Sequence, residues 1–145
     1  MKHLTQIKIE HVLEKHKYGT NAKQKENGEV FTPFNLIEKK LNEFPLSVWF
    51  DKNKTWLDPA AGLGNFHSIV LDRLSSIGNI SEKHIIENQL YFIEINPESC
   101  KLIKMIFDPN NEYNMNIYCG DALTVDVCGL TKEEWNAFSK KIVFL

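Results

Sequence analysis

Apolar residues along this chain alternate between short continuous runs and helical spacings. The short runs predict four buried strands, at residues 55–57, 90–95, 116–119 and 141–145. Between the strands, apolar residues recur every three or four positions, which predicts helices that begin at Asn65, after Asn96 and after Thr131. Strands that alternate with helices are typical of an α/β protein with a parallel sheet.

Two further helices are expected before the first strand. Residues 4–16 form a weak amphipathic pattern whose apolar positions are Leu4, Ile7, Val12 and Leu13. A second helix is expected to begin with Thr32 as the N-cap and Pro33 as the first helical residue. The polar stretch between these helices predicts a mobile connection. We therefore divide the chain into an N-terminal helix and polar linker, 1–27, and a domain, 28–145.

Residues 56–66, W-L-D-P-A-A-G-L-G-N-F, join the first strand to the next helix. Pro59 ends the strand because it has no N–H to donate to a neighbouring strand. Gly62 and Gly64 allow the backbone to turn tightly without projecting side chains. A strand, a glycine-rich turn and a helix in this order form a cofactor site at the carboxyl end of a parallel strand.

The residues around this turn argue against two common nucleotide sites. A dinucleotide fingerprint needs Gly or Ala where His67 stands, and an acid about 20 residues further on. The next acid at a strand end is Glu94, 30 residues after Gly64. A P-loop would need Gly-Lys-Ser/Thr after the turn, which this sequence lacks. Asp58 would repel a phosphate but suits a cationic or polyhydroxylated ligand.

Glu94 interrupts an apolar run at the predicted end of its strand. A carboxylate there is costly to bury unless it meets a partner. Its two oxygens can accept hydrogen bonds from two vicinal hydroxyls, such as those of a ribose. The alternative is a surface glutamate at a strand terminus.

Residues 58–66 resemble motif I of S-adenosylmethionine-dependent DNA methyltransferases, in particular the adenine-N6 class. Three more segments follow the family's order: residues 28–33 (G-E-V-F-T-P), Glu94-Ile95 and residues 120–123 (G-D-A-L), which resemble motifs X, II and III. The resemblance covers about residues 28–145 and implies the N-terminal half, about strands 1–4, of a Rossmann-like methyltransferase sheet. It also implies an S-adenosyl-L-methionine site made of Phe31, Thr32, Pro33, Asp58, Ala60, Gly62, Gly64, Phe66, Glu94, Ile95, Asp121 and Ala122.

The resemblance assigns each end of the cofactor to a segment. Residues 31–33 would close over the methionine end, and Ile95 would lie against the adenine face. The Asp121 carboxylate would accept a hydrogen bond from the exocyclic amine of the cofactor's adenine, while a backbone N–H meets a ring nitrogen.

No catalytic residue is assigned, because the family's acceptor motif is absent from the sequence. In the family, the fourth strand leads into [DNS]-P-P-[YFW], which holds the target amine and stacks on a base turned out of the duplex. Residues 108–110, D-P-N, are no substitute. We therefore expect the SAM-binding N-terminal portion of an adenine-N6 DNA methyltransferase, inactive alone, which contacts DNA through a region missing from this chain.

Two alternatives stay open at this point. The chain is a non-catalytic module that complements a second chain carrying the acceptor motif, or it belongs to a methyltransferase that acts on RNA or protein. Right-handed crossovers place the fourth strand beside the first. Its outer edge would then have no neighbour, which predicts a marginally stable or partner-dependent piece.

Composition adds few constraints. The net charge of −2 gives no electrostatic sign of nucleic-acid binding, and no apolar run is long enough to span a membrane. No signal peptide is visible. The three cysteines lack C-x-x-C spacing, so we expect free thiols, no metal site, and a cytoplasmic or other reducing compartment. His67 is expected to serve packing or the surface rather than catalysis.

Overall fold

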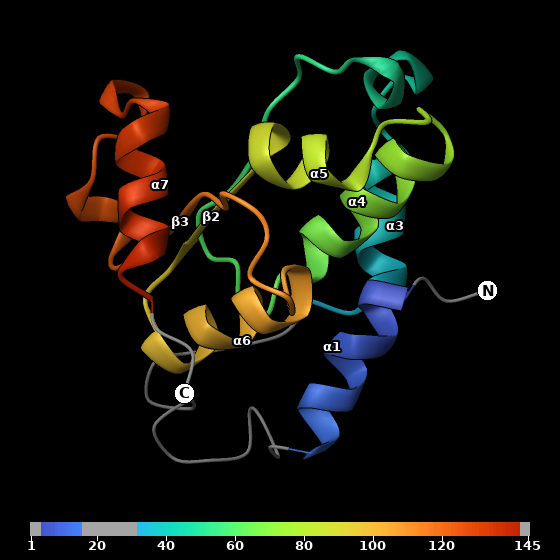
Figure 1. The fold of residues 1–145 in the computed structure, drawn as a ribbon. Helices are drawn as coiled ribbons and strands as arrows, with labels where there is room; N and C mark the ends of the chain where they lie inside the picture. The colour runs from blue at the N-terminus through green and yellow to red at the C-terminus, as the bar shows by residue number, and fades with distance from the viewer. Residues whose placement is uncertain (1–3, 16–31, 143–145) are drawn as a thin grey trace.

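The computed structural model describes residues 4–15 and 32–142 of the chain (Figure 1). Its centre is a parallel sheet of three strands in the order β1-β2-β3, with β1 (Trp56–Asp58), β2 (Leu90–Glu94) and β3 (Ile117–Cys119). Asp58 lies beside Phe92 and Glu94 lies beside Cys119, so the carboxyl ends of all three strands meet at one edge of the sheet. The first three predicted strands are confirmed within one or two residues, and the α/β class with a parallel sheet is consistent with a partial Rossmann-like fold.

Helices cover both faces of this sheet (Figure 1). The α-helices are α1 (Leu4–Lys15), α3 (Phe34–Leu41), α4 (Asn65–Ser76), α5 (Glu82–His84), α6 (Pro97–Phe107) and α7 (Lys132–Lys140). Single turns complete the described fold: η1 (Leu46–Phe50), η2 (Ile85–Gln89), η3 (Ala122–Thr124) and η4 (Val127–Gly129). None of the helices in residues 4–15 and 32–142 is long and apolar enough to cross a bilayer.

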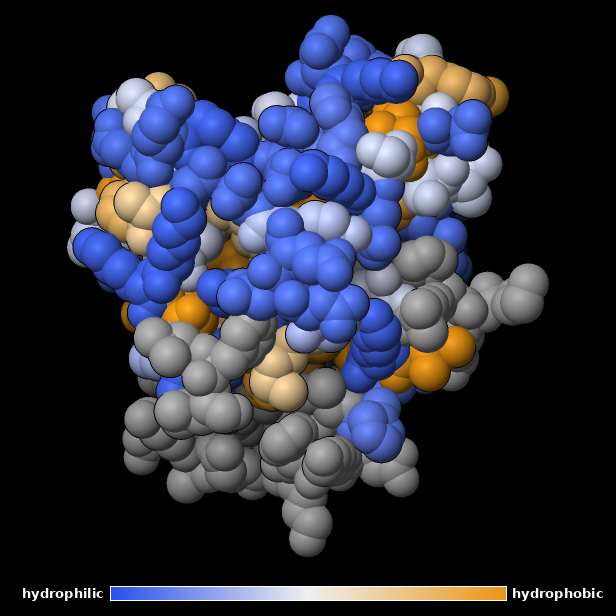
Figure 2. All heavy atoms as spheres, viewed as in Figure 1, coloured by the Kyte–Doolittle hydropathy of each residue, from blue (hydrophilic) through white to orange (hydrophobic). Residues whose placement is uncertain are grey.

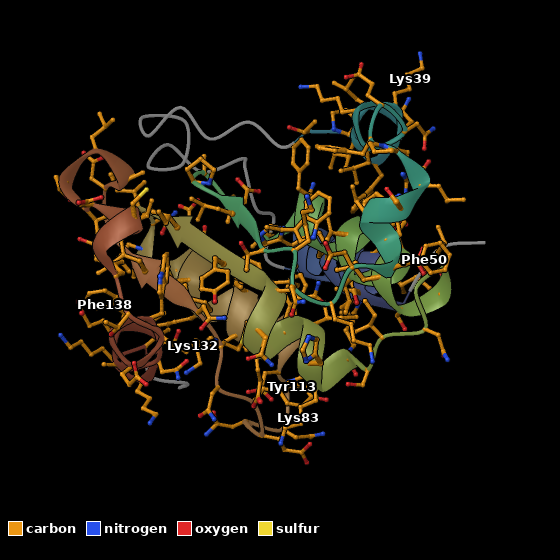
Figure 3. All side chains as sticks on the ribbon, turned by 90° about the horizontal axis from the view of Figure 1, so that it is seen from above. Lys39, Phe50, Lys83, Tyr113, Lys132 and Phe138 are labelled. Atoms are coloured by element: carbon orange, nitrogen blue, oxygen red, sulfur yellow. The ribbon has the colours of Figure 1, made fainter. Side chains whose placement is uncertain are left out.

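Neighbouring residues of the central strand face opposite layers. The Tyr91 ring packs edge-on against Trp135 of α7. The next residue, Phe92, is fully buried and packs edge-on against His67 of α4 and Phe107 of α6. Side chains alternate between the faces of a strand, so this pair assigns α7 to one face of the sheet and α4 with α6 to the other. In Figure 3, Phe138 on α7 and Phe50 in η1 lie at opposite sides of the molecule.

The helix starts after the glycine turn follow their sequence signals. The Asn96 side chain accepts a hydrogen bond from the Glu98 N–H, and Pro97 occupies the first helical position of α6. The Thr131 hydroxyl accepts from the Glu134 N–H and caps α7. These caps satisfy N–H groups that have no partner within the helix, and they are confirmed as predicted.

Helix α1 belongs to the same core as the rest of the fold. Its anchor is Ile9, which is fully buried and joins the main apolar cluster, whereas Ile7 is exposed. The predicted helix is therefore confirmed, but Ile9 was not among its expected apolar positions. Figure 2 shows that the outer face over α5 and α7 is mainly hydrophilic, with small separate hydrophobic patches.

The start of α3 differs from the prediction. Pro33, not Thr32, is the residue before the helix, with φ −61° and ψ 144°. Its carbonyl accepts from the N–H groups of Leu36 and Ile37, both at 3.1 Å. The Thr32 carbonyl is instead engaged by a side chain of α4, so tertiary contact overrides the local signal.

The strand predicted at residues 141–145 is wrong at its first two residues, which the structure describes. Lys141 and Ile142 form a turn after α7, and residues 143–145 lie outside the described part of the chain. Lys104 of α6 donates from Nζ to the carbonyls of Ser139 and Ile142, at 3.0 and 3.2 Å. These bonds hold the end of α7 near α6 and β3, on the far side of the sheet from β1.

Candidate functional site

The glycine turn is tied to the central strand by backbone hydrogen bonds. Asp58 ends β1, and its Oδ1 accepts from the Ala60 N–H at 3.1 Å. The Ala61 N–H donates to the Ile93 carbonyl of β2 at 2.9 Å. Gly62 and Gly64 have φ values of +60° and +88°, in the left-handed region that favours glycine. The tight turn that the sequence predicted is therefore present, and Gly64 leads directly into α4.

Glu94 connects the three strand ends. Its Oε1 accepts from the Gly62 N–H and its Oε2 from the Asn96 N–H, both at 2.8 Å. Its backbone carbonyl accepts from the Gly120 N–H, just past β3, at 2.9 Å. The residue is only 5% exposed, and hydrogen bonds of this charge-assisted kind offset the cost of burying a carboxylate. In this structure the partners of the Glu94 carboxylate are backbone N–H groups of two loops, and its expected contact with a ribose stays a prediction.

Apolar and acidic residues lie exposed beside Glu94. Ile95 directly after β2 is 56% exposed, and Leu123 after β3 is 94% exposed. Asp121 is also exposed, and its Oδ1 accepts from the Leu123 N–H at 2.9 Å. Ala122 begins the short turn η3. Exposed apolar side chains at the carboxyl edge of a parallel sheet are available to contact a ligand.

Asp58 and Phe66 line one hollow of about 540 Å³ beside β1, together with Phe44, Pro59 and His67 among others. Ala60, between them in sequence, is exposed. Asp58, Glu94 and Asp121 thus follow three adjacent strands at one edge, and Glu94 directly contacts the glycine turn. That the three carboxylates act on one ligand stays a prediction.

The Phe-Thr-Pro segment reaches the glycine turn through Thr32. The Nδ2 of Asn65 donates to the Thr32 carbonyl at 3.2 Å. Pro33 is exposed and precedes α3. Phe31 lies outside the described residues, so its predicted role at the methionine end has no structural test.

Asn65 is a candidate that the sequence analysis treated only as the start of a helix. Its side chain is buried, and its Oδ1 has no hydrogen-bond partner. A buried polar atom without a partner is unusual and calls for a ligand, a water molecule or strain. The one available signal was its position directly after Gly64, where helix α4 begins.

His67 is a packing residue. Its Nε2 lies 2.8 Å from the Tyr91 carbonyl, and its ring packs against Phe92. Burial lowers the pKa of His67 below the ordinary value of 6.5, although the negative charge of Asp58 and the backbone carbonyls partly oppose this shift. A neutral, buried imidazole held in this way fits the expected structural role.

Comparison with known proteins gives one match. No curated protein and no solved structure matches this chain. A family model described as N-6 DNA Methylase matches residues 9–138. This range includes the glycine turn, all three strands, Glu94 and Asp121, and it spans most of the chain. The chain therefore belongs to the N-6 DNA methylase family.

Proposed function

We propose that this chain is the S-adenosyl-L-methionine-binding portion of a methyltransferase that modifies the N6 amine of adenine in DNA. Membership of the N-6 DNA methylase family supports this function. The observation that carries it is the Glu94 carboxylate at the end of the central strand. It links the glycine turn to the start of α6 through the N–H groups of Gly62 and Asn96.

The strand ends suit the nucleoside part of this cofactor. A carboxylate has about four acceptor positions, so the two backbone donors on Glu94 do not exhaust it, and ribose hydroxyls can join or replace them. Asp121 is exposed and can accept from an adenine amine, while the exposed Ile95 offers an apolar face to the ring. The bound cofactor would supply a methyl group on a cationic sulfonium.

The methionine end of the cofactor suits the turn between β1 and α4. Asn65 Oδ1 is a buried acceptor without a partner, and the ammonium group of the cofactor is a donor. Asn65 also holds Thr32 beside the turn through Nδ2, which supports the predicted role of residues 31–33 in closing over this end. The Asp58 carboxylate adds negative charge near the same turn.

We further propose that these 145 residues do not transfer the methyl group by themselves. The sequence contains no [DNS]-P-P-[YFW], the acceptor motif that the family uses to hold the target amine. The chain's own residues would bind and orient the cofactor. The acceptor motif and the contacts to DNA would come from other residues.

A second candidate, a module that complements a separate chain, is favoured by the outer edge of β1. Leu57 is 43% exposed there, and hollows of about 540 and 290 Å³ flank the strand, both lined by Trp56 and Leu57. An edge strand with apolar hollows beside it can accept an additional strand, because backbone bonds and alternate side chains are both accommodated.

Calorimetric titration with S-adenosylhomocysteine tests cofactor binding. We expect the parent chain to bind and Glu94→Ala to weaken binding at least tenfold, because one lost charge-assisted hydrogen bond is worth about 1.5 kcal/mol. Glu133→Ala is the matched control, since Glu133 is an exposed carboxylate on α7, away from the strand ends. Asp121→Ala and Asn65→Ala test the adenine and methionine ends if Glu94→Ala does not fold. No binding heat from a folded parent chain would remove the assignment.

Transfer of tritiated methyl groups to unmethylated DNA tests the second proposal. We expect no incorporation by this chain alone, and incorporation when a polypeptide with the acceptor motif is added. Incorporation above background by the chain alone would show that an unrecognised acceptor site exists within it.

A further inference from the structure

Two of the three cysteines lie together beneath the candidate site. Cys100 is fully buried in α6, Cys119 is half-buried at the end of β3, and Cys128 is exposed in η4. The Cys100 Sγ donates to the Glu94 carbonyl, which also accepts from the Gly120 N–H, so Cys100 lies close to the end of β3 where Cys119 stands. The proposed function uses neither of them.

The alternation of side chains along β3 explains this proximity. Tyr118 packs edge-on against Phe138 of α7 on one face of the sheet. Cys119 follows it and points to the opposite face, where it packs against the core beneath α6. Cys100 of α6 reaches the same strand ends through its bond to the Glu94 carbonyl, the residue paired with Cys119. The two cysteines therefore face each other because of the fold and not because of their distance in sequence.

Both cysteines contact Glu94. The Cys100 Sγ donates to the Glu94 carbonyl at 3.3 Å. Cys119 lies directly beside Glu94 in the parallel register of β2 and β3. A change at this thiol pair would therefore act on the residue that holds the Gly62 and Asn96 N–H groups.

Only one of the two sulfurs is accessible. Cys119 lines a hollow of about 610 Å³, together with Lys101, Lys141 and other residues. Cys100 has no exposed surface, and burial raises the pKa of its thiol. An oxidant that enters the hollow would meet Cys119 first. Cys100 would then be the resolving thiol, and its raised pKa makes the formation of the S–S bond the slower of the two steps.

We propose that Cys100 and Cys119 are a reversible oxidation site, and that the disulfide between them weakens cofactor binding at the Glu94 site. The second part rests on the proposed function. With hydrogen peroxide as oxidant, the Cys119 sulfur attacks one oxygen, which gives a sulfenic acid and water. The Cys100 sulfur then displaces the hydroxyl as a second water, and the S–S bond forms. Two thiols lose two electrons and two protons to one peroxide, and an added dithiol reverses the change.

The expected effect on the site follows from the bonds that change. The disulfide removes the Cys100 S–H donor from the Glu94 carbonyl. It also requires the two sulfurs to approach to about 2.05 Å, which draws α6 and the end of β3 together around Glu94. We expect the Glu94 side chain to lose part of its alignment with Gly62 and Asn96.

Mass spectrometry of the intact chain after peroxide treatment tests the bond. We expect a loss of about 2 Da that a dithiol restores, with the bond assigned to Cys100 and Cys119 by peptide mapping under non-reducing conditions. Cys128→Ser is the matched control and should still form the bond. Cys100→Ser and Cys119→Ser should not. A folded parent chain that forms no bond, or one that uses Cys128, would overturn the proposal.

Two measurements test the coupling to the site. The S-adenosylhomocysteine affinity should fall at least fivefold on oxidation and return with a dithiol, and it should not respond to peroxide in Cys100→Ser. Amide hydrogen exchange should also become faster at Gly62 and Asn96 in the oxidised chain, whether or not a cofactor binds. Equal exchange in both redox states would overturn the coupling. If the reduced chain binds no S-adenosylhomocysteine, the proposed function fails, and the exchange result alone decides the coupling.

Discussion

Replacement of Gly64 by alanine tests the geometry of the turn between β1 and α4. Gly64 has φ +88°, where an alanine side chain costs about 1–2 kcal/mol. The added Cβ would lie 2.5 Å from Phe107 Cε2 and 3.4 Å from Phe92 Cε1. Phe107 is buried and packed edge-on against Phe92, so its ring cannot move away freely.

The backbone cost and the packing cost add to give the expected loss in the free energy of unfolding. Overpacking of a buried site costs about 1–3 kcal/mol, so Gly64→Ala should lower the free energy of unfolding by about 2–5 kcal/mol. Native domains in general are stable by about 5–15 kcal/mol, and we expect this chain near the low end of that range, so the loss would be a large fraction of its stability. Urea unfolding followed by circular dichroism measures this difference.

The control for this prediction is Gly129→Ala. Gly129 is not in the left-handed region, and its added Cβ would meet Asp126 Oδ2 at 3.4 Å, which is ordinary contact. We expect a change within about 0.5 kcal/mol.

A double variant separates the steric cost from the backbone cost. The double variant Gly64→Ala/Phe107→Leu should lose about 1 kcal/mol less free energy of unfolding than the two single variants together, because the added Cβ no longer meets the Phe107 ring. The reasoning is refuted if Gly64→Ala costs less than 1 kcal/mol, or if it costs no more than Gly129→Ala.

Three further predictions concern stability. Burial lowers the pKa of His67, so below pH 6.5 the unfolded state binds the proton more readily than the folded state. The free energy of unfolding should therefore fall with pH down to the folded-state pKa. Urea titrations of His67→Gln should show a smaller slope than those of the parent chain, and equal slopes would contradict this prediction. Ser139→Ala should lower the free energy of unfolding by about 1–3 kcal/mol in the same assay, because the buried Ile117 N–H donates to the Ser139 Oγ at 2.6 Å and would lose its acceptor. An unchanged urea midpoint would contradict that bond. The isolated chain should unfold at a low urea midpoint because the outer edge of β1 is exposed, and a cooperative transition at a high midpoint as a monomer would count against this expectation.

The sequence by itself determined the parts of this protein that depend on neighbouring residues. The glycine turn, the caps at Asn96 and Thr131 and the first three strands were all predicted, because each depends on local backbone preferences and hydrogen bonds over a few residues. The family was likewise predicted from short motifs in a set order, and the match over residues 9–138 confirmed it.

Tertiary structure decided which distant groups meet. Glu94 contacts Gly62 across 32 positions of sequence, and Asn65 contacts Thr32 across 33. The contact of Cys100 with the Glu94 carbonyl depends on how α6 covers the ends of β2 and β3. The first residue of α3 also shifted, because the Thr32 carbonyl bonds to Asn65. A single sequence carries only a weak signal for such contacts, since their partners are selected by packing of the whole chain and not by local propensity.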